Sequence, residues 1–366
     1  MVEKRPIDKL TIKGFKTLKD VEIELGKLNV LIGPNGGGKS NFVSYFHMLR
    51  EMIDGRLQVW VAKRGGADRV LSFGAKETLR FSSCIEFGDY AYCFTLESAD
   101  DERLVFRDES LRFRKVPSES ITIGDEGNRE SRIKEKIQPG ESHEANDNWT
   151  SIANWVIYHF HDTSETAWVR RTSDLYGYNY LRPDASNLAA YLFGLREFHT
   201  ATYSEICNIV RLAIPFFNDF VLEPKMIKPG EYTIQLWWRQ HDSDYEFSPS
   251  QLSDGSLRFI CLVTALMQPD PPSAIIIDEP ELGLHPYAIT LLGSLLESAS
   301  ERMQVIVATQ SPQLLDEFSV DDLIVVELED GVSVFKRLKE SDFNVWLRDY
   351  SVGELWDKNV LGGGLP

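Results

Sequence analysis

The sequence contains no long hydrophobic segment. Its apolar runs, such as FICLVTALM at 259–267, are far shorter than the roughly 20 apolar residues that a transmembrane helix needs. The charged start, MVEKRPIDKL, lacks the apolar stretch of a secretory signal peptide. We therefore expect no membrane span and a cytoplasmic location.

Cysteine is also scarce. The sequence has four cysteines, and they form neither a C-x-x-C pair nor the spacing of a metal site. We expect reduced, partly buried thiols, as is usual in a reducing compartment. The four are Cys84, Cys93, Cys207 and Cys261.

Positive charge is in deficit, with 39 Lys and Arg against 56 Asp and Glu and a net charge of −17. This balance argues against a protein that coats DNA by bulk electrostatics, but it does not exclude a local basic groove. The basic clusters form either a solvent-exposed surface or a binding surface for the phosphates of nucleic acid. Nucleic acid is therefore a possible partner. The residues of these clusters are Arg103, Arg107, Arg112, Arg114, Lys115, Arg132, Lys134, Lys136, Arg170 and Arg171.

The 366 residues, 43% of them hydrophobic, are sufficient for a large core in one or two domains. Alternating segments between 79 and 116 predict an antiparallel meander. Residues 117–150 are polar and predict a flexible insertion. The last third alternates helix with strand, which is typical of parallel strands covered by helices. The expected class is α/β, with a mixed sheet core.

The most specific motif is NVLIGPNGGGKSN, which fits G-x-x-x-x-G-K-[ST] between an apolar strand and a helix. Glycines allow the backbone N–H groups to surround phosphate oxygens, and the helix N-terminus favours an anion. Lys39 would contact the β and γ phosphates of ATP, and the Ser40 hydroxyl would ligate Mg²⁺. The nucleotide-binding residues expected here are Gly33, Pro34, Asn35, Gly36, Gly37, Gly38, Lys39, Ser40 and Asn41.

A second motif, AIIIDEPELGLHP, ends a β-branched strand with two acidic residues. Asp278 would hold the Mg²⁺ through water, and Glu279 would act as general base on the attacking water. A third motif, LSDGS at 252–256, begins an apolar helix and forms another anion-binding end. The segment VIVATQSPQLL delivers Gln310 to the carboxyl end of a strand, where open α/β sheets bind ligands. The alternative reading of Gln310 is a helix cap.

These four motifs, in this order, resemble the heads of ABC-type ATPases. The sequence is most similar to the RecF/SMC-like branch, especially the AAA-type, OLD-like proteins. The resemblance covers nearly all the chain except about 100–150, and it includes the opening LTIKGFKTLKD and the tail YSVGELWDKNVLGGG. It implies a P-loop head with an inserted helical lobe.

The resemblance implies that two protomers bind head to tail around two ATP molecules. Ser253 and Gly255 of one protomer would reach the γ-phosphate held by the other. ABC-type heads commonly carry histidine where this chain has Gln310; glutamine can orient a water but cannot become cationic, so slow hydrolysis is expected. Ser256 stands where transporters usually have glutamine.

The expected domains follow from this resemblance. Residues 1–116 and 270–345 form ATPase lobe I, and residues 151–269 form lobe II with the LSDGS signature motif. Residues 346–366 form a C-terminal tail.

Three assignments are weaker. Gln58 is one candidate for the glutamine loop of ABC heads, and Phe15 or Lys16 for the adenine contact. His159 and His161 alternate as in a strand, so they form either a metal site without an assignable third ligand or a structural element.

Two functions remain in competition. The first is a dimerising ATPase switch in DNA repair or anti-phage defence, acting with a separate effector such as a nuclease, because OLD-like relatives often carry a nuclease domain for which this chain has no room. The second is an ATP-bound scaffold or sensor that turns over little and holds a partner protein. Transport is disfavoured because more than two hundred residues separate the P-loop from LSDGS.

Overall fold

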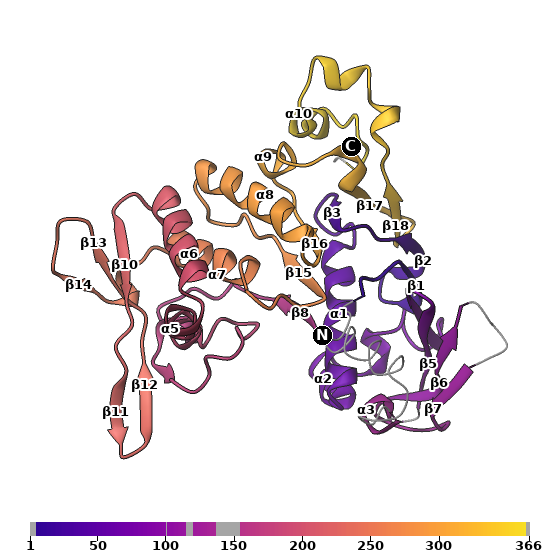
Figure 1. Ribbon diagram of the computed structural model, residues 1–366. Helices are drawn as coiled ribbons and strands as arrows, with labels where there is room; N and C mark the ends of the chain where they lie inside the picture. The colour runs from indigo at the N-terminus through magenta and orange to yellow at the C-terminus, as the bar shows by residue number, and fades with distance from the viewer. Residues whose placement is uncertain (1–4, 100, 115–119, 137–153, 364–366) are drawn as a thin grey trace.

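The computed structural model describes residues 5–99, 101–114, 120–136 and 154–363. Its elements gather around a central sheet, with an antiparallel sheet on one side and helices on the other (Figure 1). Within these residues no helix is long and apolar enough to cross a membrane.

The central sheet has the strand order β18-β17-β3-β16-β15-β8 within the described residues. All neighbours pair in parallel except β17 and β18, which are antiparallel. Both faces are buried, with Ile275 and Ile277 in one hydrophobic cluster and Ile276 in the other. Parallel strands covered on both faces need such continuous apolar runs. The strands are β3 (Leu28–Ile32), β8 (Trp155–Tyr158), β15 (Ala274–Asp278), β16 (Gln304–Ala308), β17 (Leu323–Glu329) and β18 (Val332–Arg337).

One face of this sheet packs on α1 (Lys39–Ile53), which together with α2 (Leu57–Lys63) and the outer antiparallel sheet encloses one hydrophobic cluster. The outer sheet has the order β2-β1-β4-β5-β6-β7 within the described residues, and the meander predicted from alternation is part of it. Its strands are β1 (Lys9–Phe15), β2 (Leu18–Glu24), β4 (Arg80–Phe87), β5 (Tyr90–Ser98), β6 (Leu104–Phe113) and β7 (Ser120–Gly124), followed by the short helix α3 (Ile133–Lys136).

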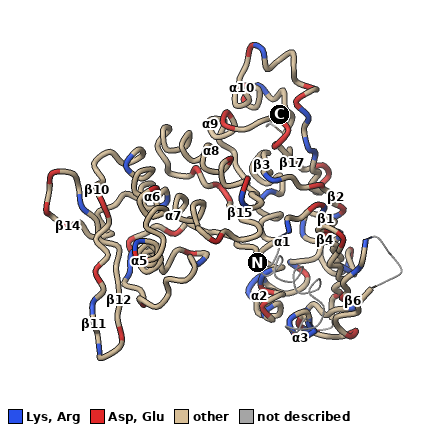
Figure 2. The backbone as a smooth tube through the Cα atoms, viewed as in Figure 1, with Lys and Arg blue, Asp and Glu red and all other residues tan. Residues whose placement is uncertain are grey.

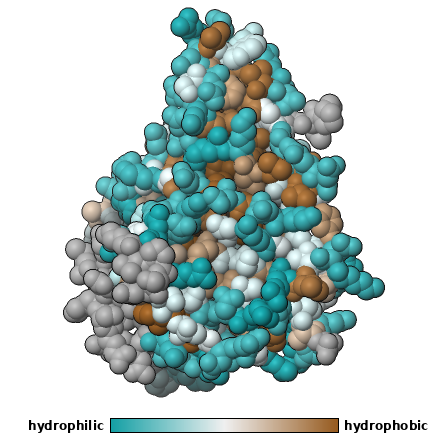
Figure 3. Space-filling model, turned by 90° about the vertical axis from the view of Figure 1, so that its right-hand side faces the viewer, coloured by the Kyte–Doolittle hydropathy of each residue, from teal (hydrophilic) through white to brown (hydrophobic). Residues whose placement is uncertain are grey.

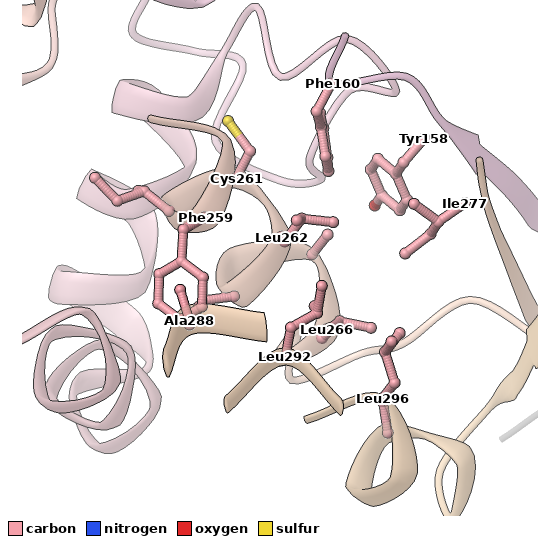
Figure 4. Close-up of a cluster of buried hydrophobic side chains, with 14 of the residues drawn as sticks. Tyr158, Phe160, Phe259, Cys261, Leu262, Leu266, Ile277, Ala288, Leu292 and Leu296 are labelled. Carbon is pink, nitrogen blue, oxygen red and sulfur yellow. The ribbon is translucent and has the colours of Figure 1, made fainter. Parts of the chain in front are cut away.

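Helices cover the opposite face. Leu262 and Leu266 of α7 lie beside Leu292 and Leu296 of α8, with Ile277 of the central sheet next to them (Figure 4). Each such leucine contributes roughly 1.5–3 kcal/mol by leaving water. The helices are α5 (Leu188–Phe198), α6 (Thr200–Ala213), α7 (Asp254–Leu266), α8 (Pro286–Ser300), α9 (Pro312–Leu315) and α10 (Val352–Asp357).

Two small antiparallel sheets extend from the helical part (Figure 1). One has the order β10-β13-β14 and the other β11-β12-β9 among the described residues. Their strands are β10 (Phe217–Val221), β13 (Trp237–Gln240), β14 (Glu246–Phe247), β11 (Lys225–Lys228), β12 (Glu231–Ile234) and β9 (Ser173–Asp174). The α/β class with a mixed sheet, an antiparallel meander and a helical part is confirmed.

The structure differs from the expected boundaries at two points. Strand β7 extends the outer sheet into the 117–150 segment that we expected to be flexible, because it pairs with β6. Strand β8 belongs to the central sheet although it lies within 151–269, because it pairs with β15. Residues 137–150 lie outside the described residues, and the division into two lobes remains a prediction.

The cysteines also correct an expectation. Cys84 and Cys93 are direct cross-strand partners on β4 and β5, with Cα atoms 4.1 Å apart, and they form a disulfide. Cys207 and Cys261 are buried free thiols, as expected.

The predicted basic clusters do not form an unopposed positive track in the described residues. Acidic and basic residues alternate along the outer sheet (Figure 2). Arg107 pairs with Glu97 at 3.4 Å, and Lys134 pairs with Asp54 at 2.9 Å. Arg170 is buried, and Lys115 lies outside the described residues. Most of the face drawn in Figure 3 is hydrophilic, with hydrophobic side chains scattered mainly over its upper half.

Candidate nucleotide-binding site

The predicted P-loop connects β3 to α1, and close packing requires its glycines. A Cβ on Gly33 would lie 2.1 Å from the main-chain oxygen of Val326, and one on Gly38 would lie 2.0 Å from Ser333 Oγ. Gly38 also has a φ of 118°, which L side chains rarely adopt. Strands β17 and β18 therefore pack directly against the loop and fix its shape. Asn35, Gly36 and Ser40 are exposed, whereas Gly37 is buried.

Lys39 lies inside this loop. Its Nζ donates hydrogen bonds to the main-chain oxygens of Gly33 at 2.5 Å and Pro34 at 3.1 Å. Burial lowers the pKa of Lys39, and the nearby acidic groups, Glu279 first, oppose that shift. The ammonium group is thus held at the loop, where a phosphate oxygen would compete for it. Asn41 donates instead to Thr17 Oγ1 at 2.8 Å, which ties α1 to the β1–β2 turn.

Asp278 and Ser40 are brought together, as predicted for two Mg²⁺ ligands. Burial, followed by the charge of Glu279, raises the pKa of Asp278, and the nearby Ser40 hydroxyl opposes that shift. Asp278 Oδ1 is buried without a hydrogen-bond partner among the described residues. Buried oxygens are normally paired, and carboxylate and hydroxyl oxygens suit Mg²⁺. The donor set therefore fits a magnesium ion.

The two predicted catalytic residues touch each other. Gln310 Nε2 donates to Glu279 Oε1 at 2.9 Å, and the N–H of Glu279 donates to Ala308 at the end of β16. Glu279 has a φ of 43°, a left-handed conformation that is strained for a residue with a side chain. Such strain is common at functional sites. The cap of the following helix is Ser311 and not Gln310, whose amide lies beside the predicted general base.

Sequence reasoning missed the role of Glu281. Its Oε1 accepts hydrogen bonds from Thr309 Oγ1 at 2.6 Å and from the N–H of Gln310 at 3.3 Å. Burial raises its pKa. Glu281 therefore fixes the backbone that presents Gln310. The available signal was its position three residues after Asp278, at the same carboxyl edge of the sheet.

The signature motif begins α7 in the helical part. Ser253 caps the helix, with its Oγ accepting from the N–H of Ser256 at 3.1 Å, and it is exposed. A Cβ on Gly255 would lie 2.1 Å from the main-chain oxygen of Gly283, so only glycine allows this approach. The motif is thus presented at the surface and packed against the loop that follows Glu281.

The candidates for the glutamine loop and for the adenine contact have other roles in the structure. Gln58 lies on α2 and donates to the main-chain oxygens of Leu104 and Arg129, so it belongs to the outer sheet and not to this site. Phe15 is fully buried, which excludes it as an adenine contact. Lys16 donates to a serine on α1.

The histidines have another explanation. His159 stacks on His47 with ring centroids 4.0 Å apart. Among the described residues no group of three His, Cys, Asp or Glu residues could hold a metal ion. The histidines therefore support a structural element more than a separate metal site.

Together, the P-loop, the paired Ser40 and Asp278, and the Glu279–Gln310 contact define the class: a P-loop nucleotide-binding head. The chain matches the family described as "AAA domain, putative AbiEii toxin, Type IV TA system" over residues 28–316, and it belongs to that family. No curated protein matches it.

Solved structures agree with this class. The chain is similar to an Smc head domain bound to the C-terminal winged-helix domain of ScpA, with a TM-score of 0.58 and 17% identity, covering 92% of this chain and 99% of the other. It is also similar to the Smc head domain with an extended coiled coil from Pyrococcus furiosus bound to the C-terminal domain of ScpA, with a TM-score of 0.60, 15% identity and coverage of 94% and 99%. The chain thus shares the fold of the Smc head domain, and it is a P-loop protein of the AAA-domain family named above.

Proposed function

We propose that this protein binds ATP and Mg²⁺ at the P-loop and hydrolyses ATP slowly. The single observation that supports hydrolysis best is the 2.9 Å hydrogen bond between Gln310 and Glu279, beside the unpartnered oxygen of Asp278. It assembles a general base, a residue that can orient water and a metal ligand at one sheet edge.

Each residue has a defined part in this reaction. Glu279 accepts the proton of the attacking water, and the amide of Gln310 orients that water. Lys39 and the N–H groups of the P-loop stabilise the negative charge on the phosphates. Ser40 and Asp278 would hold Mg²⁺, which would supply positive charge to stabilise the phosphates. Because Gln310 cannot carry a positive charge, turnover is expected to be slow.

We further propose that two protomers dimerise head to tail around ATP. Ser253 and Gly255 are presented at the start of α7, where the N–H groups of a helix N-terminus favour a phosphate. One chain needs one phosphate cradle per nucleotide, so a second anion-binding end suits a nucleotide that is held by another copy.

The dimer is tested with a hydrolysis-deficient variant, Glu279→Gln, by size-exclusion chromatography with light scattering. We expect it to be dimeric with Mg-ATP and monomeric without nucleotide. Ser253→Arg in the same background places a bulky side chain at the exposed signature motif and should remain monomeric. A Glu279→Gln protein that stays monomeric with saturating ATP contradicts the dimer.

In the cell we propose a switch in DNA repair or anti-phage defence that acts with a separate effector such as a nuclease. The alternative is an ATP-bound scaffold or sensor that holds a partner with little turnover. Turnover stimulated by DNA supports the first function. A stable, ATP-loaded complex with a partner and no stimulation supports the second.

A further inference from the structure

Arg258 is a buried arginine one turn after the start of the signature helix α7, with 7% of its surface exposed. It donates from Nε to the main-chain oxygen of Phe160 at 2.8 Å and from Nη2 to that of His161 at 3.1 Å. Its Nη1 donates to the main-chain oxygen of Leu282. One guanidinium group thus joins three parts of the chain: α7, the segment after β8, and the loop after the Asp278–Glu279 pair.

Arg170 makes a similar set of contacts on the other side of the signature motif. It is also 7% exposed, and its Nε donates to the main-chain oxygen of Thr163 at 2.8 Å. Its Nη1 donates to the main-chain oxygens of Pro249 and, at 3.1 Å, Leu252. Its Nη2 donates to Asp254 Oδ1 at 2.8 Å. The segment 160–163 is therefore fastened to both ends of the LSDGS motif.

This segment lies next to the nucleotide site. It follows β8, which pairs with the strand that carries Asp278. In Figure 4, Phe160 lies between Cys261 of α7 and Tyr158 of β8. Gly255 packs on Gly283 in the loop that Arg258 also holds. Contacts thus run without a gap from the metal-binding edge to the signature motif.

Burying these charges has a cost that an ordinary packing residue would avoid. A buried guanidinium must be fully hydrogen-bonded, and only the planar fork of arginine reaches several carbonyls at once. Lysine keeps the positive charge, but its three N–H groups share one nitrogen and cannot reach carbonyls as widely spaced as those around a guanidinium. These sets of hydrogen bonds to main-chain oxygens therefore require arginine. They connect the nucleotide site of one protomer to the signature motif that, in the proposed dimer, acts on the ATP of the other protomer.

We propose that Arg258 and Arg170 are positioning residues that couple the two ATP sites of the dimer. They hold segment 160–163 and the Leu282 loop to α7, so that the nucleotide site of a protomer and the signature motif that it offers to its partner move as one unit. This inference rests on the proposed function and adds a means of communication between its two sites. ATP turnover then depends cooperatively on ATP concentration.

The test compares Arg258→Lys with wild type in three measurements: binding of a fluorescent ATP analogue, turnover as a function of ATP concentration, and hydrogen exchange of the ligand-free protein. We expect the affinity to stay within about two-fold and kcat to fall about ten-fold or more, because charged hydrogen bonds are lost. The Hill coefficient should fall to about 1. Exchange should become faster in both 160–163 and 281–285.

Arg302→Lys is the control for a lost arginine-to-carbonyl contact at an exposed position. Arg302 also donates to main-chain oxygens near α7, to Gln268 at 2.9 Å and Leu266 at 2.6 Å, but at the far end of that helix. It should leave kcat and the Hill coefficient unchanged. Equal losses in both lysine variants would show a general loss of stability and overturn the coupling, as would an Arg258→Lys protein that behaves like wild type. If wild type itself binds no ATP, the proposed function fails and the coupling fails with it.

Discussion

Each of the two large sheets carries a carboxylate with a buried oxygen, and the two carboxylates differ in their hydrogen bonding. Glu109 of the outer sheet accepts hydrogen bonds from the hydroxyl groups of Tyr92, at 2.7 Å, and Ser131, and from the N–H of Arg132 at 3.1 Å. Asp278 of the central sheet keeps one buried oxygen unpartnered among the described residues. A fully hydrogen-bonded carboxylate stabilises the fold, whereas an unpartnered one is available to a ligand.

The difference follows from sheet topology. Parallel strands end at one edge, so β3, β15 and β16 bring the P-loop, Asp278 and Gln310 together although they are far apart in the sequence. Antiparallel neighbours in the outer sheet alternate in direction and distribute their ends between two edges. The outer sheet therefore packs beside the site, and the carboxyl edge of the central sheet carries the residues that we propose to bind and hydrolyse ATP.

The largest effect is expected at the unpartnered carboxylate. Asp278→Asn should reduce ATP turnover at least about 100-fold, the size of loss seen when a group that stabilises transition-state charge is removed. Because burial raises the pKa of Asp278, the ionised form destabilises the folded state, and the variant should unfold at the same or a higher temperature. Phosphate release and thermal unfolding measure both. A large loss of stability would assign Asp278 the structural role of Glu109.

A smaller effect is expected at Gln310, the residue proposed to orient the attacking water. Gln310→Ala should reduce kcat about 10- to 100-fold and leave ATP affinity within about two-fold, because the amide acts on the attacking water. Single-turnover phosphate release and ATP binding separate the two quantities. Equal loss of both would show that Gln310 holds the loop and not the water.

For the outer sheet we expect the reverse, a loss of stability without a loss of turnover. Glu109→Gln replaces one acceptor oxygen by an N–H donor that faces other donors, which should lower the free energy of unfolding by about 3 kcal/mol. Turnover at a temperature where the variant is folded should match wild type. Urea unfolding and phosphate release check the two parts. A turnover defect in the folded variant would contradict the claim that Glu109 of the outer sheet acts only in stability.

The smallest effect concerns acid. Burial lowers the pKa of His47 to about 3 and of His159 to about 4, from 6.5. The unfolded chain therefore binds protons first as pH falls below 6.5, and stability is lost between about pH 6.5 and 4. We expect the His159→Asn variant to lose about 2 kcal/mol less than wild type from pH 7 to 5. Urea unfolding at both pH values measures this; an exposed histidine, in His241→Asn, is the control. Equal losses in wild type and the His159→Asn variant would contradict it.

Motifs that depend on neighbouring residues were predictable from sequence. The P-loop, the acidic pair at 278–279 and Gln310 all lie where the strand and helix pattern placed them, because their chemistry requires fixed local spacing. The fold class and the meander followed from hydrophobic periodicity.

Long-range contacts were not predictable. Strand β8 is only four residues long, and nothing local indicates that it pairs with β15. The Cys84–Cys93 disulfide depends on strand register, which no local pattern fixed. Arg258 and Arg170 resemble surface residues in sequence, and their burial depends on carbonyl groups from distant segments.

The most direct test of the account is phosphate release from Mg-ATP by wild type, with Lys39→Ala as the blank. The account predicts slow turnover by wild type that clearly exceeds the blank, since Lys39 contacts the phosphates and Gln310 orients the water. If wild type and Lys39→Ala release phosphate at the same rate, the central sheet edge does not hydrolyse ATP in this protein by itself, and the central claim is wrong.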